Sequence, residues 1–195
     1  LPWALPGTVL ALGWRWIFND PYGPLNAVLH SLGVAPYGFL TTPSTTWLFV
    51  VLADVWKSTP FVALLLLAGL QSIPQDLEES LRLEGASPLQ SLRRLTLPLL
   101  TPWILLALLF RLAQALGLFD LVQVLTRGGP AGSTESLALY AYLQAMRFLD
   151  FGYSATLVVA TFALLALLSA VGLLLVLRPW RRQATTATAP ADAGR

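Results

Sequence analysis

Ionisable side chains gather in a few short stretches of this sequence, and the densest of these stretches is acidic. Four carboxylates, Asp76, Glu78, Glu79 and Glu84, fall close together. The residue types needed for covalent chemistry are scarce, because cysteine is absent and His30 is the single histidine. Without cysteine there is no disulfide or thiolate metal site, and one histidine is too few for a histidine metal cluster or a Ser-His-Asp triad. We therefore expect no catalytic residue and no metal site in this chain.

The composition indicates that the chain lies in a lipid bilayer. Of its 195 residues, 56% are hydrophobic and 11% are charged, whereas about a quarter are charged in soluble domains. Each charge at the centre of a bilayer costs roughly 2.5–3.5 kcal/mol, so charges must cluster outside the spans. The formal net charge of +2 gives no reason to expect binding to nucleic acid. The fold class that follows is all-α, a polytopic bundle of transmembrane helices.

Charges and turn-forming residues divide the chain into apolar segments and connections. We predict one transmembrane domain over residues 1–182 and a disordered tail over 183–195, which is rich in Ala, Thr and Pro. The chain starts within apolar sequence and without Met, so we expect further helices to be missing from its amino-terminal end. The predicted spans are 3–18 (partial), 47–70, 95–118 and 152–177, and the connections between them are 19–46, 71–94 and 119–151.

The positions of Lys and Arg predict the orientation, since basic loops stay on the cytoplasmic side. The 71–94 loop holds three arginines, and three more follow the last span at 178–182. The 19–46 connection holds none, and the two arginines of 119–151 are balanced by three acids. We expect a bacterial inner-membrane protein with the 71–94 loop and the carboxyl terminus in the cytoplasm.

The 71–94 loop reads as a helical hairpin. Pro74 and Asp76 are typical of a helix start, and Gly85 is typical of its end. Ser87 and Pro88 can cap and begin a second helix, which we expect to run to about residue 97, where Pro98 admits the next span. Its leucines offer more apolar surface than a solvated loop needs, so a cytoplasmic partner can cover them.

This loop resembles the EAA loop of ABC importer permeases, whose pattern is E-A-A, three residues, G, and later I-x-L-P. Here Glu79-Ser80-Leu81 takes the first position, Glu84-Gly85-Ala86 the second, and Leu95-Thr96-Leu97-Pro98 the last. Ser80 and Leu81 depart from the pattern. The resemblance implies a coupling helix that docks on a separate ATP-binding subunit, and the residues that it assigns to ATPase coupling are Glu79, Ser80, Leu81, Glu84, Gly85, Ala86, Leu97 and Pro98.

Other stretches resemble the first permease of maltose-like and glycerol-phosphate-like carbohydrate importers. They include Asp20-Pro21-Tyr22-Gly23-Pro24, Trp56-Lys57-Ser58-Thr59-Pro60 and Leu125-Thr126-Arg127-Gly128-Gly129-Pro130. The resemblance implies the following partners: ABC ATP-binding subunits, a second permease, an extracytoplasmic solute-binding protein, a small solute of the sugar class, and the lipid bilayer. ATP and Mg would be bound by the partner subunits, and no cofactor by this chain, whose only lysine, Lys57, follows a tryptophan where a P-loop needs glycine.

Three alternatives to sugar import stay open at this stage. An ABC importer for another solute, such as an amino acid or phosphate, uses the same coupling loop. A secondary transporter driven by an ion gradient, or a membrane scaffold without transport, has no stable ATPase partner. Association with an ATPase therefore separates the last two from the first.

Four residues within or beside the predicted spans are candidates for the substrate pathway: Asp54, Lys57, Arg111 and Phe119. Asp54 and Lys57 lie three apart on one helix face, where they can neutralise each other. An ion pair at the outer interface that holds neighbouring helices explains them equally well. Arg111 is expected to turn inward or snorkel. Aromatic rings can stack on sugars, although helix packing is the simpler role for most of them.

Overall fold

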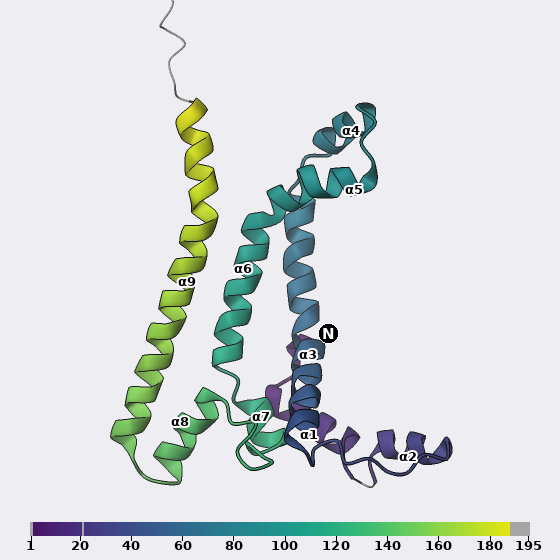
Figure 1. The fold of residues 1–195 in the computed structure, drawn as a ribbon, viewed down its shortest axis with the longest axis vertical. Coiled ribbons are helices and arrows are strands. Elements are labelled where there is room, and N and C mark those ends of the chain that lie inside the picture. The colour runs from purple at the N-terminus through teal and green to yellow at the C-terminus, as the bar shows by residue number, and fades with distance from the viewer. Residues whose placement is uncertain (1, 21, 188–195) are drawn as a thin grey trace, which may run out of the picture. The chain divides into compact units, whose positions relative to one another are not determined.

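The computed structural model describes residues 2–20 and 22–187, and the regular secondary structure of these residues is entirely helical (Figure 1). The all-α fold class predicted from the sequence is confirmed. In chain order the elements are a 3-10 turn Pro2–Ala4, α1 Gly7–Ile17, α2 Pro24–Ser31, α3 Pro43–Gln71, α4 Gln75–Leu83, α5 Pro88–Ser91, a π-helical turn Leu92–Thr96, α6 Leu97–Leu116, α7 Asp120–Leu125, α8 Leu137–Met146 and α9 Phe151–Ala187.

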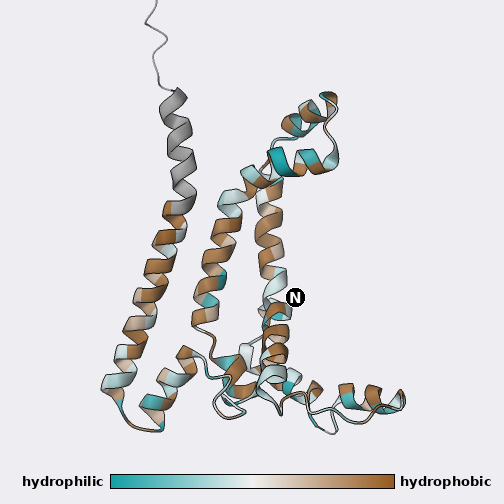
Figure 2. Cartoon of the chain, in the orientation of Figure 1, coloured by the Kyte–Doolittle hydropathy of each residue, from teal (hydrophilic) through white to brown (hydrophobic). Residues whose placement is uncertain are grey.

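Three helical stretches of the described residues are long and apolar enough to cross a membrane (Figure 2). They are Pro43–Gln71, Pro88–Leu116 and Phe151–Leu174. By contrast, the 11 residues of α1 extend only about 16 Å, too short for a hydrocarbon core of about 30 Å. Helix α9 continues to Ala187, so residues 183–187 of the tail that we expected to be disordered are helical. Residues 188–195 lie outside the described residues.

The chain divides into two compact units. Unit 1 consists of Leu1–Ala63 and Ala113–Phe162, and unit 2 of Leu64–Leu112 and Ala163–Arg195. The connections predicted over 19–46 and 119–151 therefore both belong to unit 1. The hairpin predicted over 71–94 belongs to unit 2.

Unit 1 has its own apolar core, built largely from short helices. Helices α1 and α7 pack against each other, and the core joins Leu10 and Ala11 of α1 to Val50 of α3 and Leu121 of α7. Three rings close one side of this core: Phe18 lies 4.7 Å from Phe49 and 6.0 Å from Phe39 between ring centroids. The 119–151 connection, which we predicted to be polar, therefore contributes to the core, because α7 and α8 each bury apolar side chains.

The side chain of Asn26 forms hydrogen bonds that hold together the connection before α3. Its side chain is 1% exposed. The Nδ2 group donates to the carbonyl of Asn19 at 3.3 Å and to that of Tyr37 at 3.1 Å, and Oδ1 accepts from the N–H of Tyr37 at 2.8 Å. A further bond reaches the carboxylate of Asp20 at 3.4 Å. A buried amide with these partners fixes backbone that has no sheet or helix to satisfy it.

In unit 2, α3 and α6 pack closely together where α3 has a glycine. A Cβ added to Gly69 of α3 would lie 2.5 Å from Cγ of Trp103 and 2.9 Å from Cδ2 of Leu100, both on α6. The indole of Trp103 therefore lies directly against the backbone of α3. Glycine at such a contact is typical of helix packing in membranes, where small residues let helices approach.

The start of α6 differs from the prediction. We expected the second hairpin helix to end near residue 97, with Pro98 starting a separate span, yet the chain is helical without a break over Pro88–Leu116. The five residues before α6 form a π-helical turn, in which the N–H of Leu97 bonds to the carbonyl of Leu92. Proline removes one bond from the helical ladder, and a widened turn beside it absorbs the change without ending the helix.

Candidate functional site

The α4–α5 hairpin, Gln75–Ser91, turns sharply at Gly85. This glycine has φ +78°, in the left-handed region that residues with a Cβ rarely adopt. The N–H of Glu84 bonds to the carbonyl of Ser80 at 3.1 Å, and the N–H of Ala86 reaches the carbonyl of Leu81 at 3.1 Å. These bonds satisfy carbonyls at the end of α4, as a left-handed glycine after a helix usually allows. Glycine here is therefore required by the backbone.

Ser87 begins the second arm of the hairpin in the way the sequence predicts. Its hydroxyl accepts from the N–H of Gln90 at 3.4 Å, and its own N–H donates to Oε1 of Gln90 at 2.8 Å. This reciprocal pair is a capping box, with Pro88 at the first position of the helix. Both ends of the turn are thus fixed by local bonds.

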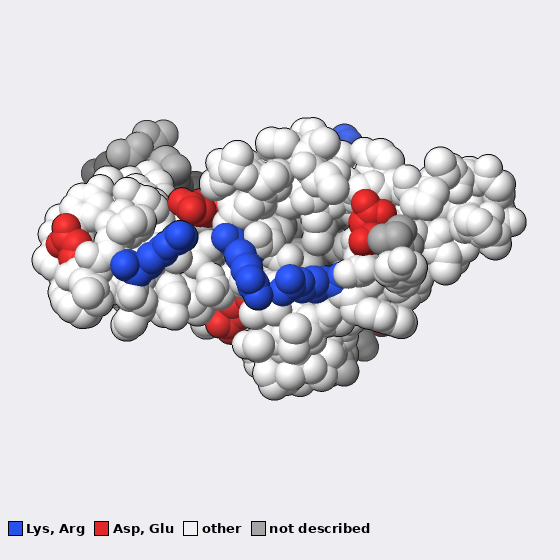
Figure 3. Space-filling view, turned by 90° about the horizontal axis from the view of Figure 1, so that it is seen from below, with Lys and Arg blue, Asp and Glu red and all other residues white. Residues whose placement is uncertain are grey.

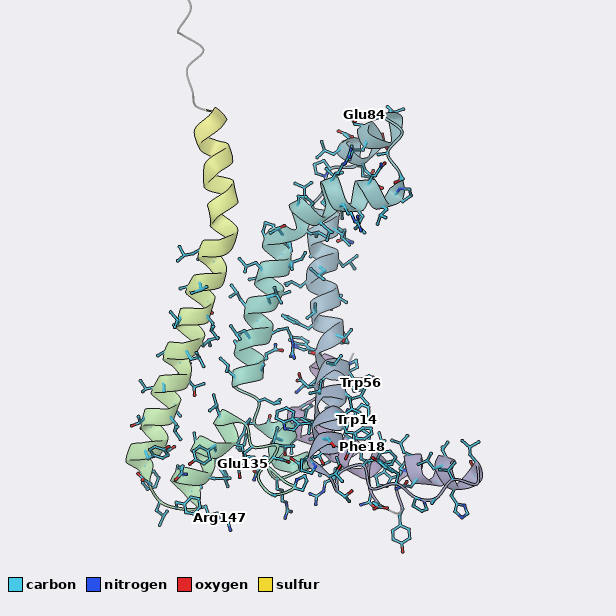
Figure 4. All side chains as sticks on the ribbon, in the orientation of Figure 1. Trp14, Phe18, Trp56, Glu84, Glu135 and Arg147 are labelled. Atoms are coloured by element: carbon cyan, nitrogen blue, oxygen red, sulfur yellow. The ribbon has the colours of Figure 1, made fainter. Side chains whose placement is uncertain are left out.

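The hairpin presents both charge and apolar surface to its surroundings. Acidic residues line the first turn of α4, where the helix dipole favours them. Leu83, one residue before the turn formed by Glu84 and Gly85, is 90% exposed, and Leu77 is 44% exposed. Glu84 lies at the tip of the hairpin (Figure 4). Together with Leu89, which is 56% exposed, these leucines leave apolar surface on the hairpin that a partner could cover.

The structure brings six of the eight predicted coupling residues together on the hairpin, from Glu79 to Ala86. Of these, the side chains of Leu81 and Ala86 are half-buried and the others are exposed. Leu97 and Pro98 lie apart from them, at the start of α6, and both are exposed. Their assignment to ATPase coupling stays a prediction.

A second candidate site is a polar cavity of about 410 Å³ in unit 1, lined by the 3-10 turn before α1, by α3, by the end of α6, and by α7 with the segment that precedes it. Its lining combines charged, polar and aromatic side chains. The residues are Trp3, Asp54, Lys57, Ser58, Gln114, Gly117, Leu118, Phe119, Asp120 and Leu121. Three of the four predicted pathway residues, Asp54, Lys57 and Phe119, therefore share one cavity, while Arg111 is not among the lining residues.

Gly7 makes room for two charged groups at the edge of this polar cavity. A Cβ added to Gly7 would lie 2.7 Å from Oδ2 of Asp120 and 3.2 Å from Nζ of Lys57. The carboxylate and the ammonium group thus converge on the first residue of α1. Any side chain larger than hydrogen at this position would collide with both groups.

Most of the aromatic residues considered for sugar stacking pack against other rings or the backbone. Trp56 meets Trp14 edge-on, with 5.6 Å between ring centroids, and Trp14 stacks on Phe18 at 5.0 Å (Figure 4). The indole N–H of Trp47 donates to the carbonyl of Ser133 at 2.6 Å. Helix packing, the simpler of the two roles, therefore accounts for these rings.

Sequence reasoning missed Asp120, which lines the polar cavity, and Gly7, which lies against Asp120 and Lys57. Asp120 directly follows Phe119, and the sequence predicts it in the 119–151 connection, whereas the structure places it at the start of α7. A glycine has no functional group that would mark it as part of a site. Only the structure shows that a side chain at Gly7 would collide with Asp120 and Lys57. A charged residue beside a predicted pathway residue was the signal available for Asp120.

Comparison with known proteins gives a consistent picture. The family model described as binding-protein-dependent transport system inner membrane component matches residues 1–183. The trehalose/maltose transport system permease protein MalF of Thermococcus litoralis is 44% identical over 164 residues, covering 84% of this chain and 55% of that protein. The sulfoquinovosyl glycerol transport system permease protein SmoG of Agrobacterium fabrum is 40% identical over 176 residues, covering 90% of this chain and 57% of that protein.

Solved structures agree on the fold. A chain of a bacterial ABC transporter involved in the import of the acidic polysaccharide alginate superposes with a TM-score of 0.80 at 22% identity, covering 91% of this chain and 62% of that one. A bacterial alginate ABC transporter in complex with an alginate pentasaccharide-bound periplasmic protein gives 0.73 at 25% identity, covering 93% of this chain and 62% of that one. In both kinds of comparison the chain spans little more than half of the protein it matches.

Proposed function

The chain belongs to the family of binding-protein-dependent transport system inner membrane components, and from this premise we propose that it is part of the permease subunit of an ATP-driven importer for a sugar or sugar-like solute. Membership of this family makes it a multi-pass membrane protein. The sugar is favoured because named relatives transport trehalose, maltose and sulfoquinovosyl glycerol. The solute would reach this chain from an extracytoplasmic binding protein, and a second permease would complete the pathway.

In this proposal the α4–α5 hairpin is the dock for an ATP-binding subunit, which binds ATP and Mg and performs all of the chemistry. The observation that carries the proposal is the exposed, rigid turn at Gly85, capped on one side by Ser87 and flanked by the exposed Leu83. A rigid element joined directly to two spans can pass movement of the ATPase to α3 and α6.

The role of the hairpin is tested by replacing Gly85 with valine in the full-length protein, together with its ATPase and partner permease. Valine cannot adopt φ +78° without strain and adds bulk where a partner would dock. We expect ATPase association and solute uptake to fall at least about ten-fold, which corresponds to about 1.4 kcal/mol of lost interaction.

Gly33 offers a matched control on the other unit. It has φ +74°, and like Gly85 it has no heavy atom within 4 Å of an added Cβ. Gly33→Val imposes the same backbone strain far along the chain from the hairpin, so uptake should persist at close to the unsubstituted level. Equal losses in the two variants, or full activity in Gly85→Val, would contradict the coupling role.

The orientation of the hairpin can be measured directly, since these 195 residues contain no cysteine. We propose that the hairpin and the carboxyl terminus face the cytoplasm, as the arginine distribution favours. A Glu84→Cys variant should react with a membrane-impermeant maleimide in inverted vesicles and stay unreacted in intact cells. Labelling from outside intact cells would place the hairpin beyond the reach of any ATPase and end the proposal.

A further inference from the structure

Helix α2, Pro24–Ser31, is covered by the rest of unit 1 on one side only. Leu25 and Leu29 pack against the apolar core, and Asn26 is buried with its hydrogen-bond partners. Val28 belongs to the same helix and is apolar too, yet its side chain is 55% exposed. Packing within unit 1 therefore leaves an apolar part of α2 uncovered.

The turn that follows α2 adds two exposed apolar residues. Leu32 is 71% exposed and Val34 is 50% exposed. The N–H of Leu32 bonds to the carbonyl of Val28 at 3.2 Å, and the next bond runs from the N–H of Val34 to the carbonyl of Leu29 at 2.9 Å. Bonds of this kind close the end of a helix and turn the chain back over its last residues. Val28, Leu32 and Val34, which we call the α2 tip, are thus exposed on a backbone with fixed hydrogen bonds.

Helix α2 runs across the direction of the part of α3 that belongs to unit 1, at the level where α3 begins (Figure 1). The helical stretch Pro43–Gln71 is long and apolar enough to cross a membrane. A helix perpendicular to it at this end lies close to the plane of the membrane surface. The first turns of α3 expose apolar side chains at the same level, with Trp47 45% and Leu48 62% exposed. The α2 tip therefore extends an apolar surface that already faces lipid.

The residues around the α2 tip carry no charge. Residues 24–46 contain no Asp, Glu, Lys or Arg, whereas the 71–94 loop contains seven such residues. An interface with a soluble protein has a polar rim around its apolar centre. Tyr37, whose carbonyl bonds to Asn26, is 48% exposed, and tyrosine is enriched where membranes meet water. This composition suits a lipid surface better than a soluble partner.

From these observations we infer that the α2 tip is seated in lipid, at the boundary between headgroups and acyl chains, and anchors unit 1 at the membrane surface. Interfacial helices place their apolar side about 5–10 Å into this boundary and keep their polar side in water. The inference goes beyond the proposed function, because it depends only on α3 crossing the membrane and involves neither solute nor ATPase. In the proposed orientation the anchored surface is the outer one.

Val28 and His30 form a matched pair of positions for testing the anchor. Both side chains are exposed, and two residues at about 100° each place them on nearly opposite sides of α2. The assembled full-length transporter, with any cysteine outside these 195 residues replaced by serine, carries Val28→Cys or His30→Cys labelled with the fluorophore NBD in phosphatidylcholine nanodiscs. A doxyl quencher near the headgroup end of the acyl chain should quench the label at Val28→Cys at least about three-fold more than at His30→Cys.

Leu32→Cys is a second probe of the α2 tip and should be quenched as Val28→Cys is. Equal quenching at Val28→Cys and His30→Cys would overturn the inference. Stronger quenching from the far end of the acyl chain would also overturn it, because an interfacial tip lies near the headgroups. Blue-shifted NBD emission without doxyl quenching would show that protein, and not lipid, covers the tip. Each of these outcomes leaves the Gly85 variants as a separate test of coupling.

Discussion

Unit 1 and unit 2 differ in where their buried residues lie. All ten residues of the buried apolar core cluster, from Leu10 to Leu139, belong to unit 1. Among the described residues of unit 2, the buried apolar side chains are Leu100 and Ala107. Unit 1 therefore stabilises its own irregular connections, whereas unit 2 relies on turns, caps and close helix contacts and leaves most of its apolar surface to lipid or to other subunits.

The two units also differ in charge on their exposed surfaces. Seen from below the view of Figure 1, basic and acidic side chains occur side by side on the same face (Figure 3). One of the basic residues of unit 1, Arg15, donates to the carbonyl of Val124 at 3.3 Å, so its role there includes structure. The hairpin of unit 2 instead concentrates acids in the first turn of α4.

A substitution that disrupts the buried interior of unit 1 should give the largest loss of stability. Asn26→Ala removes a buried amide that bonds to Asn19, Asp20 and Tyr37, and we expect a loss of about 3 kcal/mol in the free energy of unfolding. Thermal unfolding of the purified full-length protein in detergent measures it. Asn19→Ala, whose side chain is exposed, is the control; a loss as large in the control would show that the buried network is not what holds the connection.

A smaller effect is expected where unit 2 depends on close approach. Gly69→Ala places a methyl group 2.5 Å from the ring of Trp103 and should cost about 2 kcal/mol through overpacking. Gly172→Ala is the control, because its nearest neighbour, Leu105, would lie at an ordinary 3.7 Å. The same unfolding measurement applies, and indistinguishable melting of the two variants would refute the close contact.

The smallest effect should be confined to the hairpin. Ser87→Ala removes the capping box and should destabilise α5 by about 1 kcal/mol, seen as faster amide hydrogen exchange near Gln90 with the overall melting temperature almost unchanged. Ser91→Ala, a serine whose side chain makes no capping bond, should leave exchange as it was. A large fall in melting temperature for Ser87→Ala would contradict the idea that unit 2 is stabilised locally.

The sequence was most informative where local chemistry decides the structure. The end of α4 at Gly85 and the cap at Ser87 were predicted from residue type, because a left-handed turn and a capping box each involve only a few neighbouring residues. The all-helical fold followed from composition in the same way.

Prediction failed where the structure depends on contacts between segments that are far apart in the sequence. The connections 19–46 and 119–151 looked polar, yet Phe39, Leu121 and Leu139 from them are buried in the core of unit 1. Short helices whose apolar sides meet only in three dimensions give a weak periodic signal. The convergence of Lys57 and Asp120 on Gly7 likewise depends on three segments far apart in the sequence, which no local pattern can bring together.

The π-helical turn at Leu92–Thr96 has a consequence for the direction in which side chains point. One extra residue in a turn advances everything after it by about 100° around the helix axis. The arm that begins at Ser87 and the span that places Trp103 against Gly69 can therefore face independent directions, although they belong to one unbroken helix. Deleting a single residue from this turn would realign the two faces, so that correct docking at one end would require incorrect packing at the other.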